Sequence, residues 1–186
     1  MSEENTGIIR LRKKYLPQID QKPSEDDARR LRAAQSMRNA IMESLIVITL
    51  FSVFWSMLSV AFGRIFPWLT LLLGFLIGLA VRRAGMGLDW RFPTLAAVFT
   101  LLGSLLSNIV VAAAFTAPIL KTTTLAVLTN LTVLTWPVFF DEVMTPADLI
   151  IALFSAGIAA FYANRRLTRA EYLALRTWEE KDVRQD

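Results

Sequence analysis

Few residues in this chain could do chemistry, and most of those are carboxylates and arginines at the edges of apolar segments. The 186 residues include no cysteine and no histidine, which excludes a thiolate nucleophile, a Cys/His zinc site and a histidine-ligated haem. Asp141, Glu142 and Asp148 are close in sequence and could bind a divalent cation through oxygen. Without histidine, the case for a lipid enzyme at the membrane surface is weak. We therefore expect no catalytic residue, no metal site and no cofactor.

Two polar side chains lie within apolar segments, where ionisable and amide groups are candidates for function. Glu43 is one turn into the first apolar segment, where it could reach arginines at the same membrane face. Asn108 is the only side-chain amide at the middle of such a segment, and a hydrogen bond between helices is its simplest use. The basic, glycine-containing loop 82–89 has no P-loop lysine after it, so contact with lipid head groups is favoured over a nucleotide site.

The elements that carry these residues are apolar segments of membrane-spanning length. We expect transmembrane helices at residues 41–62, 65–81, 92–117 and 147–163. The first would rise about 33 Å at ~1.5 Å per residue, enough for a ~30 Å hydrocarbon core. The second is short, so that the bilayer must thin or the flanking arginines must reach to the interface. The fold class is therefore an all-α integral membrane protein with a four-helix bundle over residues 41–163.

The distribution of basic residues sets the expected orientation. Eighteen of the 20 Lys and Arg residues lie on one side of these four spans, and only Arg64 and Lys121 lie on the other. Lys and Arg are enriched in cytoplasmic loops, so both termini are predicted to be cytoplasmic in a multi-pass inner-membrane protein. The net charge of +4 then follows from topology, and no nucleic-acid partner is expected.

Residues 122–140 form the ambiguous segment. A fifth span there would place the basic C-terminal tail outside, against the charge distribution. Its leucines favour one helical face, and Trp136 could anchor it. We therefore expect an outer-side helix that is either amphipathic at the interface or re-entrant.

The two ends of the chain are predicted to be cytoplasmic and partly helical. Residues 1–40 are basic, with a surface helix from about residue 24, and residues 164–186 contain a capping box at Thr168 and Glu171. The basic helix could bind anionic lipid, which is the more ordinary use of such a cluster, or dock a partner protein. The arginines expected to contact lipid or a partner are Arg64, Arg82, Arg83, Arg165 and Arg166.

Small and hydroxylated residues recur at helical spacing in every predicted span. Such faces allow helices to approach closely in lipid, with each hydroxyl bonding back to its own helix. The alternative is that they line a polar pathway. The packing or pathway residues are Thr49, Ser52, Ser56, Ser59, Gly63, Gly74, Gly78, Thr100, Gly103, Ser107 and Asn108.

Two stretches of sequence carry a resemblance. The run from Gly78 to Gly87, with the sequence GLAVRRAGMG, and the opening of the last span at Ala147–Ile150, with the sequence ADLI, resemble small uncharacterised four-span bacterial inner-membrane proteins. The resemblance covers mainly spans 2 to 4. It implies a bacterial inner membrane and a four-span fold, and it implies no activity or site.

Three functions follow, in decreasing order of support. The first is a non-enzymatic membrane subunit or scaffold that forms a homo-oligomer or docks a membrane protein partner, because every span has a close-packing face. The second is an oligomeric channel or small-solute transporter with the hydroxyl stripe inward, although charged residues for coupled transport are missing from the spans. The third is the lipid enzyme.

Overall fold

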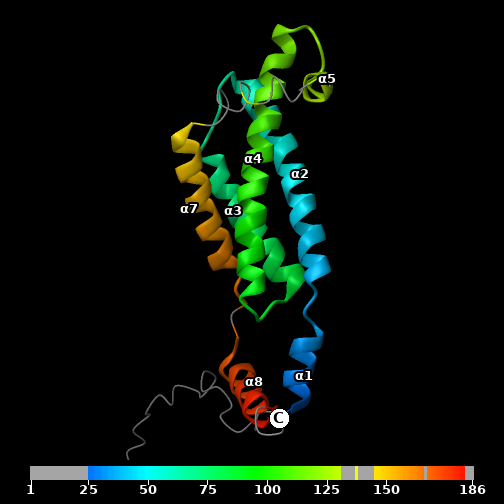
Figure 1. The fold of residues 1–186 in the computed structure, drawn as a ribbon, viewed down its shortest axis with the longest axis vertical. Helices are drawn as coiled ribbons and strands as arrows, with labels where there is room; N and C mark the ends of the chain where they lie inside the picture. Colours follow the sequence, from blue (N-terminus) through cyan, green and yellow to red (C-terminus); the bar gives the residue numbers. More distant parts are fainter. Residues whose placement is uncertain (1–24, 131–136, 138–144, 166, 183–186) are drawn as a thin grey trace, which may run out of the picture. The chain divides into compact units, whose positions relative to one another are not determined.

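The computed structural model describes residues 25–130, 137, 145–165 and 167–182, and within these ranges the regular secondary structure is helical. Two compact units are distinguished: one contains most of α1 together with α8, and the other contains the helices from α2 to α7. The helices are α1 (Glu25–Ala33), α2 (Met37–Phe62), α3 (Leu69–Ala80), the π-helix η1 (Val81–Gly85), α4 (Arg91–Ile119), α5 (Thr124–Thr129), α7 (Pro146–Ala163) and α8 (Arg169–Asp182) (Figure 1).

Three helices in the described ranges are long and apolar enough to cross a membrane: α2, α4 and α7. They coincide with the first, third and fourth predicted spans. α7 begins at Pro146, one residue before the predicted start of the fourth span, and Thr145 and Asp148 form a capping box there. The chain is therefore all-helical where it is described, with three helices of membrane-spanning dimensions.

The second predicted span, 65–81, differs from the helix that forms. Its first residues make a tight turn, in which the carbonyl oxygens of residues 66, 67 and 68 accept hydrogen bonds from the amides of residues 69, 70 and 71, respectively. The helix α3 therefore starts only at Leu69. The helix also continues past the predicted stop at the paired arginines, because η1 carries it to Gly85 in a wider π-type turn. The 12 residues of α3 alone would rise only about 18 Å.

The segment predicted at 122–140 contains α5, a helix of six residues capped by the Thr123 hydroxyl, which accepts from the Ala126 amide at 3.2 Å. None of the α5 residues is buried. Residues 131–136 and 138–144 lie outside the described residues, so the choice between an amphipathic and a re-entrant segment remains a prediction.

The terminal helices form their own unit. The helix expected from about residue 24 begins at Glu25, and its Ala28 and Leu31 are buried. The predicted capping box before α8 is present. The Thr168 amide and hydroxyl donate to the Glu171 carboxylate at 2.8 and 2.9 Å, and the Glu171 amide donates back to the Thr168 hydroxyl.

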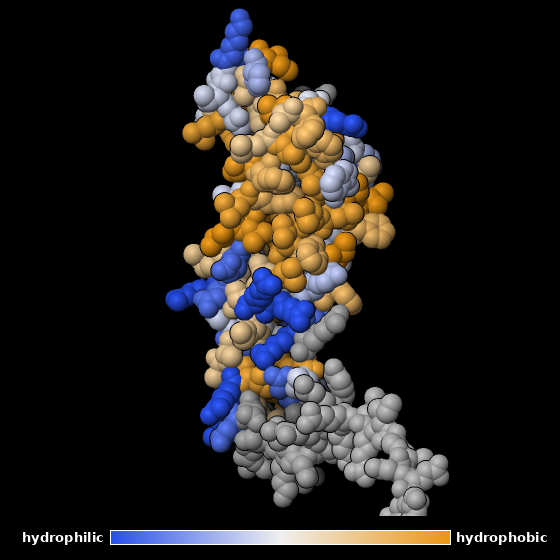
Figure 2. Space-filling model, turned by 180° about the vertical axis from the view of Figure 1, so that it is seen from behind, coloured by the Kyte–Doolittle hydropathy of each residue, from blue (hydrophilic) through white to orange (hydrophobic). Residues whose placement is uncertain are grey.

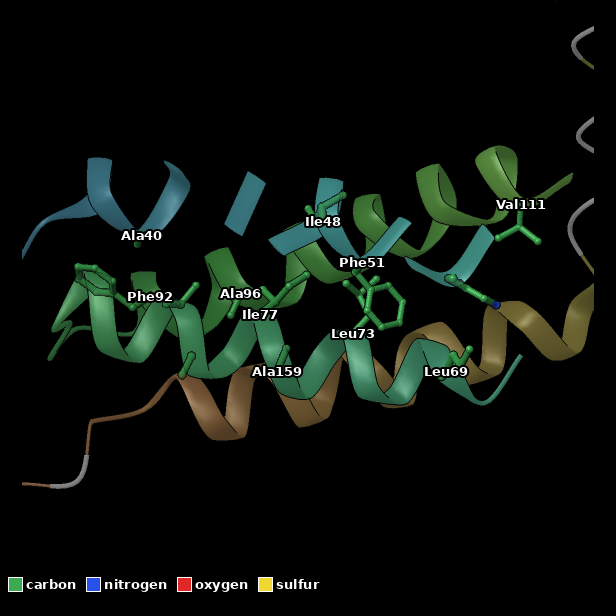
Figure 3. Packing of buried hydrophobic residues seen from close by; sticks show 13 residues of the cluster. Ala40, Ile48, Phe51, Leu69, Leu73, Ile77, Phe92, Ala96, Val111 and Ala159 are labelled. Carbon is green, nitrogen blue, oxygen red and sulfur yellow. The ribbon is translucent and has the colours of Figure 1, made fainter. Parts of the chain in front are cut away.

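The core of the larger unit lies where α3 packs on α7, α4 packs on both α7 and α2, and α2 covers α3 and η1. In Figure 3 the side chains of Phe51 and Leu73 lie together between α2 and α3, and Ala159 lies between α3 and α7. Leu73 and Ile77 of α3 are fully buried. The short helix α3 therefore packs against α2, α4 and α7.

The contact between α3 and α7 depends on two glycines four residues apart. A Cβ atom added to Gly74 would collide with the backbone oxygen of Ser155, and one added to Gly78 would lie 2.7 Å from the backbone oxygen of Ala159. The Ser155 hydroxyl also donates to the Thr70 carbonyl at 2.5 Å. Close approach of this kind is the usual basis of helix association in lipid, and here it joins two helices of one chain.

Large apolar side chains lie mainly on the outside of this unit. Figure 2 shows one apolar face of the bundle, with hydrophilic residues gathered toward the end where α2 begins. The interior is instead rich in alanine, glycine and serine. A small-residue interior under an apolar exterior suits a hydrocarbon environment, where burial of apolar surface does not drive packing. The exposed residues include Met42, Leu45, Leu50, Phe54 and Met57 of α2 and Leu149, Leu153, Phe154 and Phe161 of α7.

The role of the glycine contact is tested by the same substitution at two glycines. Gly74→Ala is expected to destabilise the protein by about 1–3 kcal/mol, because backbone must move to admit the methyl group. Gly157 has nothing within 4 Å of an added Cβ, so Gly157→Ala is expected to be neutral or to stabilise by up to about 1 kcal/mol. Reversible unfolding in mild detergent gives both values, and equal effects at the two positions would contradict this account.

Candidate functional site

One concave feature of the bundle has charged residues at one end: a groove between α2 and the run α3–η1. Its volume is about 690 Å³, within the range of ligand sites in proteins. Its walls are apolar except at one end, where Glu43 and Arg83 lie. The lining residues are Glu43, Val47, Leu50, Phe51, Phe54, Leu72, Leu76, Leu79, Ala80, Arg83 and Ala84.

The charged end of the groove follows from the course of the chain. The first turns of α2 lie against η1 at the end of α3, which brings Glu43 and Arg83 to one site across 40 residues of sequence. The π-type turn η1 is also held at its last residue, Gly85, by contacts with the residues around it. The Ser36 amide donates to the Gly85 carbonyl at 2.9 Å, and a Cβ on Gly85 would lie 2.8 Å from the Phe92 ring.

The two arginines of this turn have different surroundings. Arg83 is exposed and lines the groove, whereas Arg82 is half-buried and is not among the lining residues. Met86 follows η1 in the left-handed conformation at φ 47°, and its sulfur lies 3.9 Å from an Nη1 donor of Arg165. Both glycines of this loop, Gly85 and Gly87, lie against the Phe92 ring, where a Cβ on either would collide with it, so packing explains their presence.

The hydroxyl stripe predicted along the first span does not lie on one interior face. Thr49 is exposed and donates to the Leu45 carbonyl at 2.9 Å, and Ser56 donates to the Val53 carbonyl at 2.8 Å. Gly63 is exposed and ends α2 in the left-handed conformation at φ 63°, with its amide bonded to the preceding turn. Only Ser52 and Ser59 of this set are buried.

One hydroxyl pair joins α2 to α4. Ser52 and Ser107 lie with their Oγ atoms 2.7 Å apart, and Ser52 Oγ is also 2.7 Å from the Ile48 carbonyl oxygen. Nearby, a Cβ on Gly103 would lie 2.8 Å from the Ile48 side chain, and the buried Thr100 donates to the Ala96 carbonyl at 2.7 Å. These α4 residues therefore face α2 or bond within α4, as helix-packing groups do.

Asn108, which follows Ser107 in the sequence, is half-buried.

Sequence reasoning did not single out Trp55, although this residue is fully buried one turn before Ser59. The Trp55 Nε1 and Ser59 Oγ atoms are the two buried side-chain polar atoms that find no hydrogen-bond partner within the described ranges. The i, i+4 spacing of a tryptophan and a serine on the buried face was the available signal.

The remaining predicted residues are dispersed. Arg64 is exposed after α2, with its Cζ 5.6 Å from the centroid of the Phe66 ring, a cation–π geometry. Asp148 accepts from the Thr145 amide and hydroxyl at 3.0 and 2.6 Å, so its carboxylate caps α7. Asp141, Glu142 and Arg166 lie outside the described residues. In the part of the chain that is described, no group of acidic residues is placed to hold a metal ion.

No family model, curated protein or solved structure matches this chain. The function must therefore be argued from the groove, the packing contacts and the surface.

The hydrogen bond between Ser52 and Ser107 predicts a measurable coupling energy between substitutions at these two residues. A double-mutant cycle with Ser52→Ala and Ser107→Ala is expected to give about 0.6 kcal/mol, the usual size of an interhelical hydrogen bond in a membrane protein. The control cycle pairs Ser44→Ala with Ser107→Ala, because the Ser44 hydroxyl bonds to the Ala40 carbonyl of its own helix at 2.8 Å. Unfolding in mild detergent measures both cycles, and coupling of equal size in the control would show that the Ser52–Ser107 bond is not its source.

Proposed function

We propose that this protein is a non-enzymatic integral membrane subunit that holds a protein partner, either another copy of itself or a second membrane protein. One observation carries this proposal: most buried hydroxyls of the described bundle bond to helix backbone or across to a neighbouring helix, and Trp55 Nε1 and Ser59 Oγ are the two buried polar atoms without a partner there. Ser52 bonds across to Ser107, Ser155 bonds to the α3 backbone, and Thr100 bonds to its own helix. The residues from 44 to 63, 69 to 81, 92 to 119 and 149 to 163 contain no Asp, Glu, Lys or Arg.

The topology belongs to the same proposal. We propose four crossings of a bacterial inner membrane with both termini in the cytoplasm, supported by the 18 basic residues on one side. The 12 residues of α3 and the five of η1 together rise about 25 Å at ~1.5 Å per residue. This length falls somewhat short of a ~27–30 Å core, and arginine side chains can reach across such a difference to the interface.

The alternative of an oligomeric channel has less support. It requires the Thr49–Gly63 stripe to face a pore, yet Ser52 and Ser59 are buried within the chain while Thr49 and Gly63 are exposed. A pore would then be lined mainly by apolar side chains of α2, such as Leu50 and Phe54.

We assign the docking of the partner protein to the terminal helices α1 and α8, whose surfaces differ from those of the bundle helices. Arg29 and Arg30 of α1 are exposed beside the buried Ala28, and α8 exposes Tyr172 and Leu173 beside the buried Ala174. Each helix therefore has a buried alanine, and beside it α1 exposes charged side chains and α8 exposes large apolar ones, a combination that suits recognition of a partner more than a span would.

The test is site-directed photocross-linking in native membranes, for which the natural absence of cysteine is an advantage. A benzophenone maleimide on Arg29→Cys or Tyr172→Cys is expected to give a protein adduct heavier than the monomer. The matched control is the same probe on Lys121→Cys, which lies at the end predicted to be periplasmic. If the probes at residues 29 and 172 give free monomer and lipid adducts but no protein adduct, the terminal helices bind lipid and no partner, and the proposal is overturned.

A further inference from the structure

We propose that the groove between α2 and α3 binds one phospholipid, with an acyl chain along its apolar wall and a phosphoethanolamine head group at its charged end. In this arrangement the Arg83 guanidinium binds the phosphate and the Glu43 carboxylate accepts hydrogen bonds from the ammonium group. The ligand is therefore phosphatidylethanolamine. This inference goes beyond the proposed partner-holding function and does not depend on it.

The dimensions of the groove match one leaflet of a bilayer. Along α2 its lining runs from Glu43 to Phe54, and the 11 steps between these two residues rise about 16 Å at ~1.5 Å per residue. Half of a ~30 Å hydrocarbon core is about 15 Å. The charged end therefore lies at the level of the head groups when the far end, at Phe54 and Leu72, reaches the bilayer centre.

The side chains of the wall favour an acyl chain over a protein helix. Leu50, Phe54 and Leu72 are exposed by 66%, 53% and 40% and stand along the groove as large, branched or aromatic groups. Association of a second helix in lipid needs small residues for close approach. The glycines of α3, Gly74 and Gly78, already contact α7, and the small residues of the groove, Ala80 and Ala84, flank Arg83. A flexible chain of methylene groups can follow such an uneven surface, whereas a helix about 10 Å wide cannot.

The charge pattern selects the head group. Within the described ranges, no ion pair joins Glu43 to Arg83 or to any other residue, so both charges are available to a ligand that lies across them. A carboxylate beside a guanidinium complements a head group that contains an ammonium beside a phosphate. An anionic lipid without an amine, such as phosphatidylglycerol, would gain the contact with Arg83 and be repelled by Glu43. Charge-assisted hydrogen bonds of both kinds are among the stronger polar contacts in proteins.

The arginine is also held in place by the backbone. The π-type turn that contains it is fixed by the Ser36–Gly85 hydrogen bond and by the Phe92 ring against Gly85. The guanidinium therefore projects from an anchored turn at the rim of the groove, which lowers the cost of ordering it on a ligand.

The test is native mass spectrometry of the full chain, delipidated and titrated with phosphatidylethanolamine or phosphatidylglycerol. The wild type is expected to bind phosphatidylethanolamine about fivefold more tightly than phosphatidylglycerol, the factor for one surface charge contact. Glu43→Gln is expected to abolish or reverse this preference. Arg83→Gln is expected to weaken both lipids, and Leu72→Trp is expected to do so by filling the apolar end.

The control is Arg91→Gln, an exposed arginine at the start of α4 that does not line the groove, and it is expected to behave as wild type. Because the two lipids are compared within each variant, a general loss of folding cannot imitate a change of preference. Soluble phosphoethanolamine at the same concentration should not compete, since it has no acyl chain. The proposal is overturned if wild type and Glu43→Gln show the same lipid preference, or if Leu72→Trp binds both lipids as wild type does.

Discussion

The close approach of α3 to α7 is the contact on which the rest of the structure depends. In hydrocarbon, apolar side chains gain little by leaving lipid for protein, so helices associate where their backbones can come near one another. Gly74 and Gly78 provide this on α3, and Ser155 and Ala159 provide it on α7. Because α2 and α4 also pack on α3, a shift of α3 away from α7 would disturb the contacts that both of these helices make with it.

This constraint also explains where function can and cannot reside. Glycine, alanine and serine are committed to helix contacts, and the helix residues 44–63, 69–81, 92–119 and 149–163 contain no Asp, Glu, Lys or Arg. The regions whose side chains are left for binding a ligand or partner are the outer surface, the two terminal helices and the ends of the bundle helices. The groove forms there because α2 lies over α3 and η1 with large side chains between them, so that close contact on one side of α3 leaves a furrow on the other.

Much of this arrangement follows from the sequence. The apolar length of α2, α4 and α7, the caps at Thr145 and Thr168 and the glycines of α3 all depend on neighbours within one or two turns, and such local signals are readable. The groove and the Ser52–Ser107 bond join residues 40 to 55 positions apart and depend on helix rotation, which hydroxyl spacing alone does not determine. The π-type turn differs from the prediction because paired arginines are typical of the end of a span, whereas η1 passes through Arg82 and Arg83. The late start of α3 depends on the turn at residues 66–68, which apolar composition does not reveal.

The most direct measurement asks whether the glycine contact lies within one chain. In the cysteine-free protein, a Cβ at Gly78 would lie 2.9 Å from the Tyr162 Cβ, below the ~3.5–4.5 Å of a disulfide, so α3 and α7 must separate by roughly an ångström to form the bond. Oxidation of the double variant Gly78→Cys, Tyr162→Cys in membranes is expected to give a monomer with an internal disulfide, identified by mass spectrometry. A covalent dimer linked through residue 78 of two chains, with no internal bond, would show that this glycine face serves association between copies and would contradict the account.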